Sequence, residues 1–124
     1  MTALSPKQQR SKKAFTDGVQ KEFIAALLLR AKLYRVLGTR LRTPFGEVDI
    51  LAEKNGSLII VEVKSRSSVA ASAEAISHTQ KERLMRAAEY LSPRFKTAHT
   101  TIRMDAFLFA PKQFPKHIKN AFGA

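Results

Sequence analysis

The segment Gly46–Lys64 constrains this chain more than any other part of its sequence, because it has the pattern of a β-hairpin. Asn55 and Gly56 stand between two runs in which apolar and polar residues alternate. Asn-Gly is the strongest short-range signal for a two-residue hairpin turn. With this turn, Lys54 pairs with Ser57, and the register of both strands is fixed. The sequence therefore predicts which residues of the two strands face each other.

The predicted register gathers charged side chains on one face of the hairpin. Asp49 lies opposite Glu62, and Glu47 lies opposite Lys64. A slip by one residue would exchange the two faces, so it would bury these charges and expose the aliphatic side chains. The other face is accordingly expected to be apolar, with Val48, Ile50, Ile59, Val61 and Val63.

The pair of Asp49 and Glu62 needs an explanation, since like charges placed opposite each other destabilise a sheet. Glu62 also lies within Leu58–Val63, a run typical of a strand buried on both faces, where an acid requires a partner or a metal. Two carboxylates this close suit a hard, oxygen-liganded cation such as Mg²⁺. The alternative is a solvated face on which Glu47 and Lys64 form an ion pair and the acidic pair is tolerated.

Composition sets further bounds. The chain has 124 residues, enough for one domain with one core. Lys and Arg number 22 against 10 Asp and Glu, and the formal net charge of +12 favours a polyanionic partner such as nucleic acid. The absence of cysteine excludes disulfides and cysteine-based zinc sites. Because no segment resembles a signal sequence or a membrane span, we expect a cytoplasmic protein without membrane contact.

The rest of the chain predicts helices packed on a small mixed β-sheet, an α/β fold of order α-β-β-β-α-β-α. Residues 1–13 are expected to form a flexible basic arm, followed by a single domain over residues 14–124. The elements expected beside the hairpin are a helix over Phe15–Tyr34, a strand over Tyr34–Arg42, a helix with Thr79 as N-cap that ends at Ser92-Pro93, a strand over Thr100–Ala110 and a helix over Pro115–Phe122.

The first of these helices carries an acid, Glu22, on its apolar stripe, three residues after Val19 and four before Ala26. This spacing directs Glu22 at or beside the core. A lone acid in such a place is most often a boundary residue, but the acids of the hairpin favour a shared site. The stripe expected to face the core consists of Phe15, Val19, Phe23, Ala26, Leu27 and Leu33.

These motifs resemble the PD-(D/E)xK nuclease superfamily, in which an aspartate such as Asp49 precedes a triplet such as Glu62-Val63-Lys64. Within that superfamily the chain resembles archaeal-type Holliday-junction resolvases and, among them, the bacterial YraN family. Gly46–Ile50 resembles that family's GEIDL motif, and Val61–Arg66 resembles its VEVKTR motif. The resemblance extends from about Gly18 to Phe122.

Weaker matches and two departures complete the comparison of motifs. Arg103-Met104-Asp105 fits the family's RFD strand, and the residues from His117 to Phe122 fit its C-terminal end. Lys21 stands where the family usually has glycine. Gln80-Lys81 reverses the usual Lys-Gln order, which turns the lysine by about 100° around the helix.

The resemblance implies a restriction-endonuclease-like fold and metal-dependent hydrolysis of phosphodiester bonds in DNA, selective for branched or junction structures. It also implies a homodimer by analogy. The residues it assigns to catalysis are Glu22, Asp49, Glu62, Lys64 and Gln80. Those it assigns to Mg²⁺ or Mn²⁺ are Asp49, Glu62 and the carbonyl of Val63. Those expected to contact nucleic acid are Arg42, Arg66 and Lys81.

A rival interpretation is a non-catalytic nucleic-acid-binding module that has kept the fold. The positive charge fits both functions. The acids favour the enzyme, because a pure binding module gains little from clustered carboxylates that repel phosphate. A ribosome-associated basic protein would explain the charge but not the hairpin.

Overall fold

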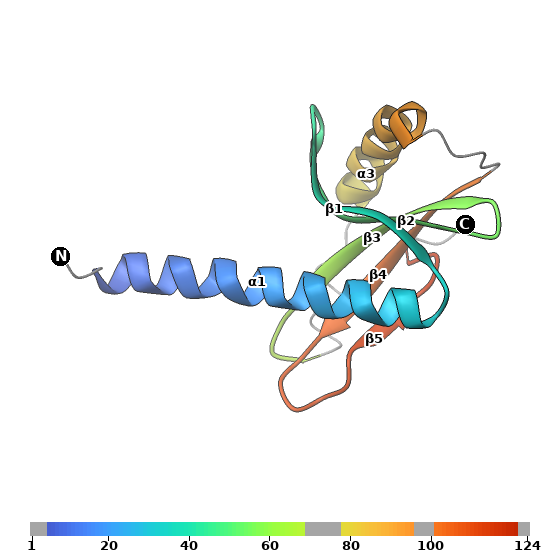
Figure 1. Cartoon of the computed structure of the whole chain (residues 1–124). Helices are drawn as coiled ribbons and strands as arrows, with labels where there is room; N and C mark the ends of the chain where they lie inside the picture. The colour runs from blue at the N-terminus through green and yellow to red at the C-terminus, as the bar shows by residue number, and fades with distance from the viewer. Residues whose placement is uncertain (1–4, 69–77, 96–100, 122–124) are drawn as a thin grey trace.

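The computed structural model describes residues 5–68, 78–95 and 101–121, which form one sheet with a helix on each face (Figure 1). The elements in chain order are α1 (Pro6–Ala31), β1 (Arg35–Thr43), β2 (Gly46–Lys54), β3 (Ser57–Ser65), α3 (His78–Leu91), the 3₁₀-helix η1 (Ser92–Phe95), β4 (Thr101–Phe109) and β5 (Lys116–Ile118). The predicted α/β class, with a small mixed sheet flanked by helices, is confirmed.

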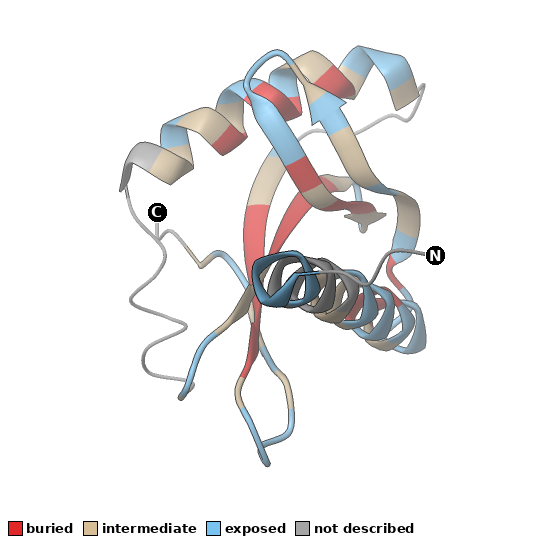
Figure 2. Cartoon of the chain, turned by 90° about the vertical axis from the view of Figure 1, so that its left-hand side faces the viewer, coloured by how far each residue is buried: buried red, intermediate tan, exposed pale blue. Residues whose placement is uncertain are grey.

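The sheet has five strands in the order β1-β2-β3-β4-β5. The pairing of β3 with β4 is parallel, and the other three pairings are antiparallel. A parallel pair needs a long crossover, and the segment containing α3 provides it. Figure 2 shows that buried residues concentrate in the central strands and on one side of α3. The core therefore lies in two layers, one on each face of the central strands.

One core layer packs under α1 and the other under α3. The α1 layer contains Ala25, Ala26, Leu29, Tyr34, Ile50, Ala52, Ile59, Val61, Phe107 and Phe109. The α3 layer contains Val48, Leu51, Leu58, Ile60, Leu84, Ala87, Ala88, Leu91 and Met104. Because both faces of β3 are covered, its residues are apolar on both sides, as the run before Glu62 predicted.

The hairpin register is confirmed from Lys54, which pairs with Ser57, to Ile50, which pairs with Val61. Asn55 and Gly56 have φ values of 51° and 79°, the positive values that a type I′ turn requires. One detail of the expected faces is wrong. Val48 packs in the α3 layer, whereas Ile50 packs in the α1 layer, so the alternation of side chains is broken at the residue between them.

Helix α1 begins earlier than expected, so the proposed basic arm is helical from Pro6 onward. Ser5 accepts a hydrogen bond from the Gln8 amide at 3.2 Å, and the Gln8 side chain accepts one from the Ser5 amide at 2.8 Å. This reciprocal capping box starts the helix. Residues 1–4 of the proposed arm lie outside the described residues.

The face of α1 that meets the sheet also differs from the expected stripe. Ala25, Ala26 and Leu29 are buried, but Phe23 is 61% exposed and Leu27 is 48% exposed. Small alanine side chains allow the helix to approach the sheet closely, and its N-terminal part extends beyond the sheet (Figure 1). Phe23 and Leu27 therefore do not face the sheet.

The prediction of a C-terminal helix over Pro115–Phe122 is wrong. Residues Lys116–Ile118 form β5, which pairs with β4 so that Leu108 faces Lys116. Strand pairing replaces the helix because it buries the side chain of His117, which is 2% exposed, against Asp105. Helix α3 begins at His78, so Thr79 lies inside the helix and is not its N-cap.

Asp105 holds the C-terminal strand and the end of α1 together. Its carboxylate is fully buried and accepts hydrogen bonds from Arg103 at 2.8 and 3.0 Å, from His117 Nε2 at 2.8 Å and from the Asn120 amide at 2.9 Å. Arg103 also donates to the Tyr34 hydroxyl at 2.7 Å. Burial acts to raise the pKa of Asp105, but the bonds from His117, Arg103 and Asn120 outweigh it and lower that pKa.

We predict that Asp105→Asn lowers the free energy of unfolding by about 3 kcal/mol at neutral pH, because an amide cannot satisfy the donors that surround this carboxylate. The lowered pKa means that the stabilisation by Asp105 is present above the unfolded-state value of 3.8 and is lost as the pH falls below it. The difference between wild type and variant should therefore shrink in acid. Urea unfolding at pH 7 and at pH 3.5 measures it.

The matched control is Glu53→Gln, whose partner Arg35 has a side chain that is 73% exposed. Loss of this ion pair should change the free energy of unfolding by less than about 1 kcal/mol. Equal stability of Asp105→Asn and Glu53→Gln would contradict the anchoring role of Asp105.

Candidate metal centre

The candidate site begins where β2 and β3 part. Their regular pairing ends at Ile50 and Val61. Beyond that pair, the Asp49 carboxylate oxygen Oδ2 accepts the Val63 amide at 2.8 Å. The side chain thus takes a main-chain donor of the neighbouring strand, and the carboxylate is held at a fixed place in the opening between the strands.

Strand β1 is also irregular at this level. Thr39 pairs with Ile50 and Leu41 pairs with Val48, so Arg40 lies across from Asp49. Arg40 has φ 51°, a left-handed conformation that a long side chain rarely adopts. Strained backbone of this kind often lies at functional sites. Both strands beside the Asp49 carboxylate therefore depart from regular geometry.

Three acids converge at this opening. Glu22 of α1 and Glu47 and Asp49 of β2 each place one carboxylate oxygen within 4.8 Å of the others. Arg40 contacts two of them, with 2.9 Å from Nη1 to Glu22 and 3.7 Å from Nη2 to Glu47. Its guanidinium offsets part of the negative charge.

Glu62 lies beside these three acids, on the side of α3. Glu22, Glu47, Asp49 and Glu62 together are called the acidic group. Glu62 is 3% exposed, and Arg83 of α3 donates to its carboxylate at 2.9 Å. The pKa of Glu62 is raised to about 9, first by burial and then by a hydrogen bond with Asp49 and by the negative charge of Asp49, while Lys64 and Arg83 act to lower it. Glu62 is therefore protonated at neutral pH, and it shares a hydrogen bond with Asp49.

The pKa of Glu22 is also raised, first by burial and then by the charge of Asp49, against the opposing effect of Arg40. Burial is the first cause of the raised pKa in both Glu22 and Glu62, and the negative charge of Asp49 adds to it. Oxygen ligands of this kind are those that Mg²⁺ and Mn²⁺ prefer. The donor set fits such an ion.

A hollow of ≈ 240 Å³ opens beside Glu22 between α1 and β1. Val19, Phe23 and Ala26 line it from the helix, and Thr39 and Arg40 line it from the strand. Glu22 and Arg40 thus border a hollow at the surface.

The structure brings together four of the predicted site residues. Asp49 raises the pKa of both Glu22 and Glu62, and Lys64 is close enough to lower the pKa of Glu62. The predicted metal set included the Val63 carbonyl, and the contact observed for Val63 is made by its amide.

The other predicted residues lie around this group. Gln80 and Lys81 are half-buried in the first turn of α3. Arg42 is exposed on β1 and pairs in register with Glu47. Arg66 is exposed at the end of β3, where its guanidinium donates to the Ser65 carbonyl at 2.6 Å.

Sequence reasoning did not assign Arg40 or Arg83 to the site. Arg83 donates to Glu62 and, at 3.4 and 3.3 Å, to the carbonyls of Phe45 and Glu47. Only the docking of α3 brings it there. Arg40 could have been found, because extension of the β1 pairing places it across from Asp49. Lys21, which departs from the family's glycine, donates to Ser65 Oγ at 2.7 Å.

Comparison with known proteins finds a matching family and bacterial relatives. A family model described as "Uncharacterised protein family UPF0102" matches residues 21–109, which include the whole acidic group. A UPF0102 protein of Caulobacter sp. strain K31 is 44% identical over 94% of this chain and 84% of its own length. One of Caulobacter vibrioides is 42% identical over 98% of both chains, and one of Bradyrhizobium sp. strain ORS 278 is 43% identical over 90% of this chain and 79% of its own. These bacterial relatives correct the archaeal-type comparison.

We predict that Asp49→Asn leaves the free energy of unfolding without divalent ions unchanged or raises it by about 1 kcal/mol. The amide oxygen can accept the Val63 amide, and its NH₂ group can donate to Glu62, so one repulsive charge is removed without loss of hydrogen bonds. Urea unfolding in EDTA measures this change.

Arg83→Met is the opposing variant, because it leaves Glu62 buried without this cation and should lower the free energy of unfolding by about 2 kcal/mol. A loss of more than about 1 kcal/mol in Asp49→Asn would show that the charge of Asp49 is structural.

Proposed function

Because the chain belongs to the UPF0102 family, and because its acids converge beside a lysine, we propose that it is a metal-dependent nuclease. The reaction would be hydrolysis of phosphodiester bonds in nucleic acid, with DNA of branched or junction structure as the substrate. Membership of the PD-(D/E)xK superfamily is part of this proposal. The spacing from Asp49 to Glu62-Val63-Lys64 and the helix acid Glu22 support it.

The observation that carries the proposal is the excess of carboxylate at Asp49. Glu22, Glu47 and Glu62 all approach it, and the nearby arginines leave the pKa values of Glu22 and Glu62 raised. A fold gains no stability from such repulsion, so a ligand of opposite charge is the simplest reason to keep it. When bound, Mg²⁺ or Mn²⁺ would polarise the phosphate and lower the pKa of a water molecule.

The protein's own residues would divide the remaining tasks. Asp49 and Glu62 would bind the ion, and Glu22 would support it. Lys64, two residues after Glu62 on β3, would orient the attacking water or donate to a phosphate oxygen. Arg40 would be released from Glu22 and Glu47 when a cation replaces it, and its guanidinium could then contact phosphate.

A non-catalytic nucleic-acid-binding module is the second candidate. The net charge of +12 favours it as much as it favours the nuclease. The acidic group favours the nuclease, because four carboxylates would weaken binding of phosphate by a protein that did not use them. No described helix is both long and apolar enough to cross a bilayer. Residence in the cytoplasm and a homodimer stay predictions.

We predict that the wild type cleaves branched DNA with Mg²⁺ or Mn²⁺ and does not cleave it in EDTA. Asp49→Asn should lower the rate at least about 100-fold through loss of the ion. Lys64→Ala should lower the rate similarly while metal binding, measured by calorimetry, is kept. Labelled single-stranded, duplex, flap and four-way DNAs form the panel, and Glu53→Gln is the control. No cleavage of any substrate, with metal binding unaffected by Asp49→Asn, would support the binding module.

We further predict that binding to DNA weakens steeply with salt and depends little on sequence. Each phosphate neutralised should add about 0.9 to the negative slope of log K against log salt. Binding of two unrelated sequences at several salt concentrations, in EDTA, measures both properties. A flat plot would remove the electrostatic basis for a nucleic-acid partner.

A further inference from the structure

The loop between β4 and β5 carries an unusual combination of side chains. Phe114 is 81% exposed, and Lys112 and Lys116 on either side of it are also exposed. A phenylalanine this exposed has almost none of its ring buried by its own chain. Aromatic rings between lysines are the combination with which proteins bind unpaired nucleic-acid bases and their phosphates.

We propose that this loop binds unpaired nucleotides beside the scissile bond, with Phe114 stacked on a base and Lys112 and Lys116 on phosphates. The inference rests on the proposed nuclease function and specifies its substrate: nucleic acid in which bases next to the cleaved bond are splayed out of the helix.

The pairing of strands places the loop at the end of the sheet that carries Lys64. Strand β4 runs parallel to β3, with Leu108 beside Lys64 and Phe109 beside Ser65, and the Arg66 amide donates to the Phe109 carbonyl at 3.2 Å. The loop begins directly after Phe109, the last residue of β4. A strand that reached the acidic group would therefore pass this end of the sheet.

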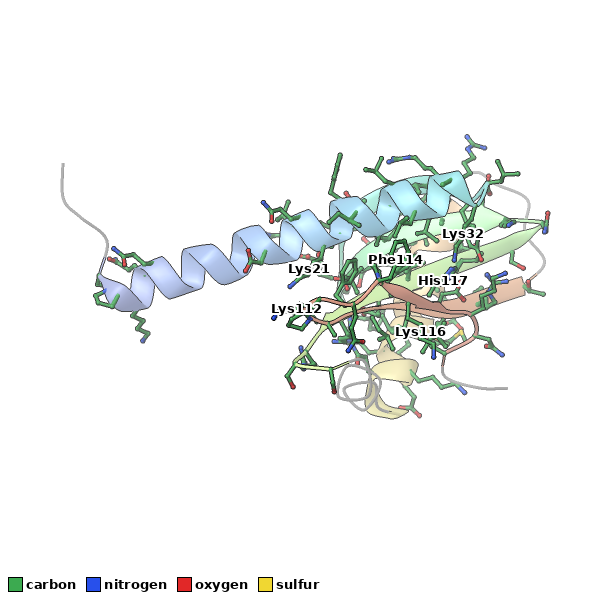
Figure 3. The ribbon with its side chains drawn as sticks, turned by 90° about the horizontal axis from the view of Figure 1, so that it is seen from below. Lys21, Lys32, Lys112, Phe114, Lys116 and His117 are labelled. Atoms are coloured by element: carbon green, nitrogen blue, oxygen red, sulfur yellow. The ribbon has the colours of Figure 1, made fainter. Side chains whose placement is uncertain are left out.

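The labelled basic residues lie along the same side of the molecule as the loop. Figure 3, seen from below, labels Lys112, Phe114, Lys116 and His117 together with Lys21 and Lys32. Lys21 donates to Ser65 Oγ at 2.7 Å, and Lys32 lies 3.0 Å from His117 Nδ1. Two hydrogen bonds thus link α1 to the strand ends on either side of the loop.

The charged residues of the C-terminal segment are all basic. From Ala106 to its end, the sequence has lysines at positions 112, 116 and 119 and no acidic residue. The phosphate backbone would meet no repulsion from this segment, in contrast to the acidic group at Asp49. Base stacking on Phe114 would then add to an attraction that is already favourable.

The loop is held on a rigid base. The Gln113 amide donates to the Ala110 carbonyl at 3.3 Å, which closes a tight turn. Lys112 has φ 60°, a backbone conformation in which glycine is favoured at this position of the turn. The turn carries a lysine there nonetheless. His117, bonded to the buried Asp105, fixes the returning strand. A preformed loop loses little conformational freedom when it binds.

The test is binding of fluorescently labelled DNA in EDTA, with a four-way junction and a single strand compared against a fully paired duplex of equal length. Phe114→Ala should weaken binding of the junction and the single strand about 10-fold and binding of the duplex less than 2-fold. Phe114→Trp should restore the affinity because it keeps a stacking ring, and Phe114→Leu should not.

Leu33→Ala is the matched control. Leu33 is an 83% exposed apolar residue, and it lies beside Asn55 and Gly56 at the other end of the hairpin strands. Its truncation should change no affinity. The proposal would be overturned if Phe114→Ala bound DNA as tightly as the wild type, or if it lost as much affinity for the duplex as for the junction. It would also be overturned if Phe114→Leu restored the affinity, or if Phe114→Ala changed the oligomeric state in sedimentation.

The binding assay separates this proposal from the nuclease itself. A selective loss of junction binding in Phe114→Ala, in a protein that cleaves nothing, would uphold the loop's role and refute the nuclease. Metal-dependent cleavage by the wild type, with Phe114→Ala cleaving and binding every DNA normally, would uphold the nuclease and refute the loop's role.

Discussion

The hydrogen bond from the Val63 amide to the Asp49 carboxylate is the interaction on which the candidate site depends. It lies where the regular pairing of β2 with β3 stops, and it fixes an acid in the opening between two strands. Because Val63 stands between Glu62 and Lys64, the same bond sets the position of the whole triplet relative to Asp49. Helix α1 then brings Glu22 to this point, and α3 brings Arg83.

The cost of this arrangement is electrostatic. Burial and mutual repulsion raise the pKa values of Glu22 and Glu62, and Arg40 and Arg83 compensate only in part. The contrast with Asp105 is informative. That carboxylate is also buried, yet its pKa is lowered because His117, Arg103 and the Asn120 amide all donate to it. The protein can therefore satisfy a buried acid fully, which makes the raised pKa values of Glu22 and Glu62 a property of the site rather than of the fold.

Local signals in the sequence predicted the hairpin and much of the site. The Asn55-Gly56 turn and the alternation around it give the register, and the register brings Asp49 near Glu62. Contacts between distant segments were not predictable in the same way. The inward face of α1 depends on how closely alanine side chains approach the sheet, β5 forms because His117 meets Asp105, and Arg83 reaches Glu62 only once α3 is docked. Val48 changes layer because of the irregularity at Asp49, which strict alternation does not include.

The most direct test of the central claim, that the acidic group is a divalent-metal site, is a titration of the ¹⁵N-labelled protein with Mn²⁺. Paramagnetic broadening decreases steeply with distance from the ion. We expect one Mn²⁺ per chain to broaden the amide signals of Asp49, Val63 and Lys64 first, while those of Asn55 and Gly56 in the hairpin turn persist. Broadening that begins instead around the exposed Glu82 and Glu89, or no localised broadening at all, would contradict a metal site at Asp49.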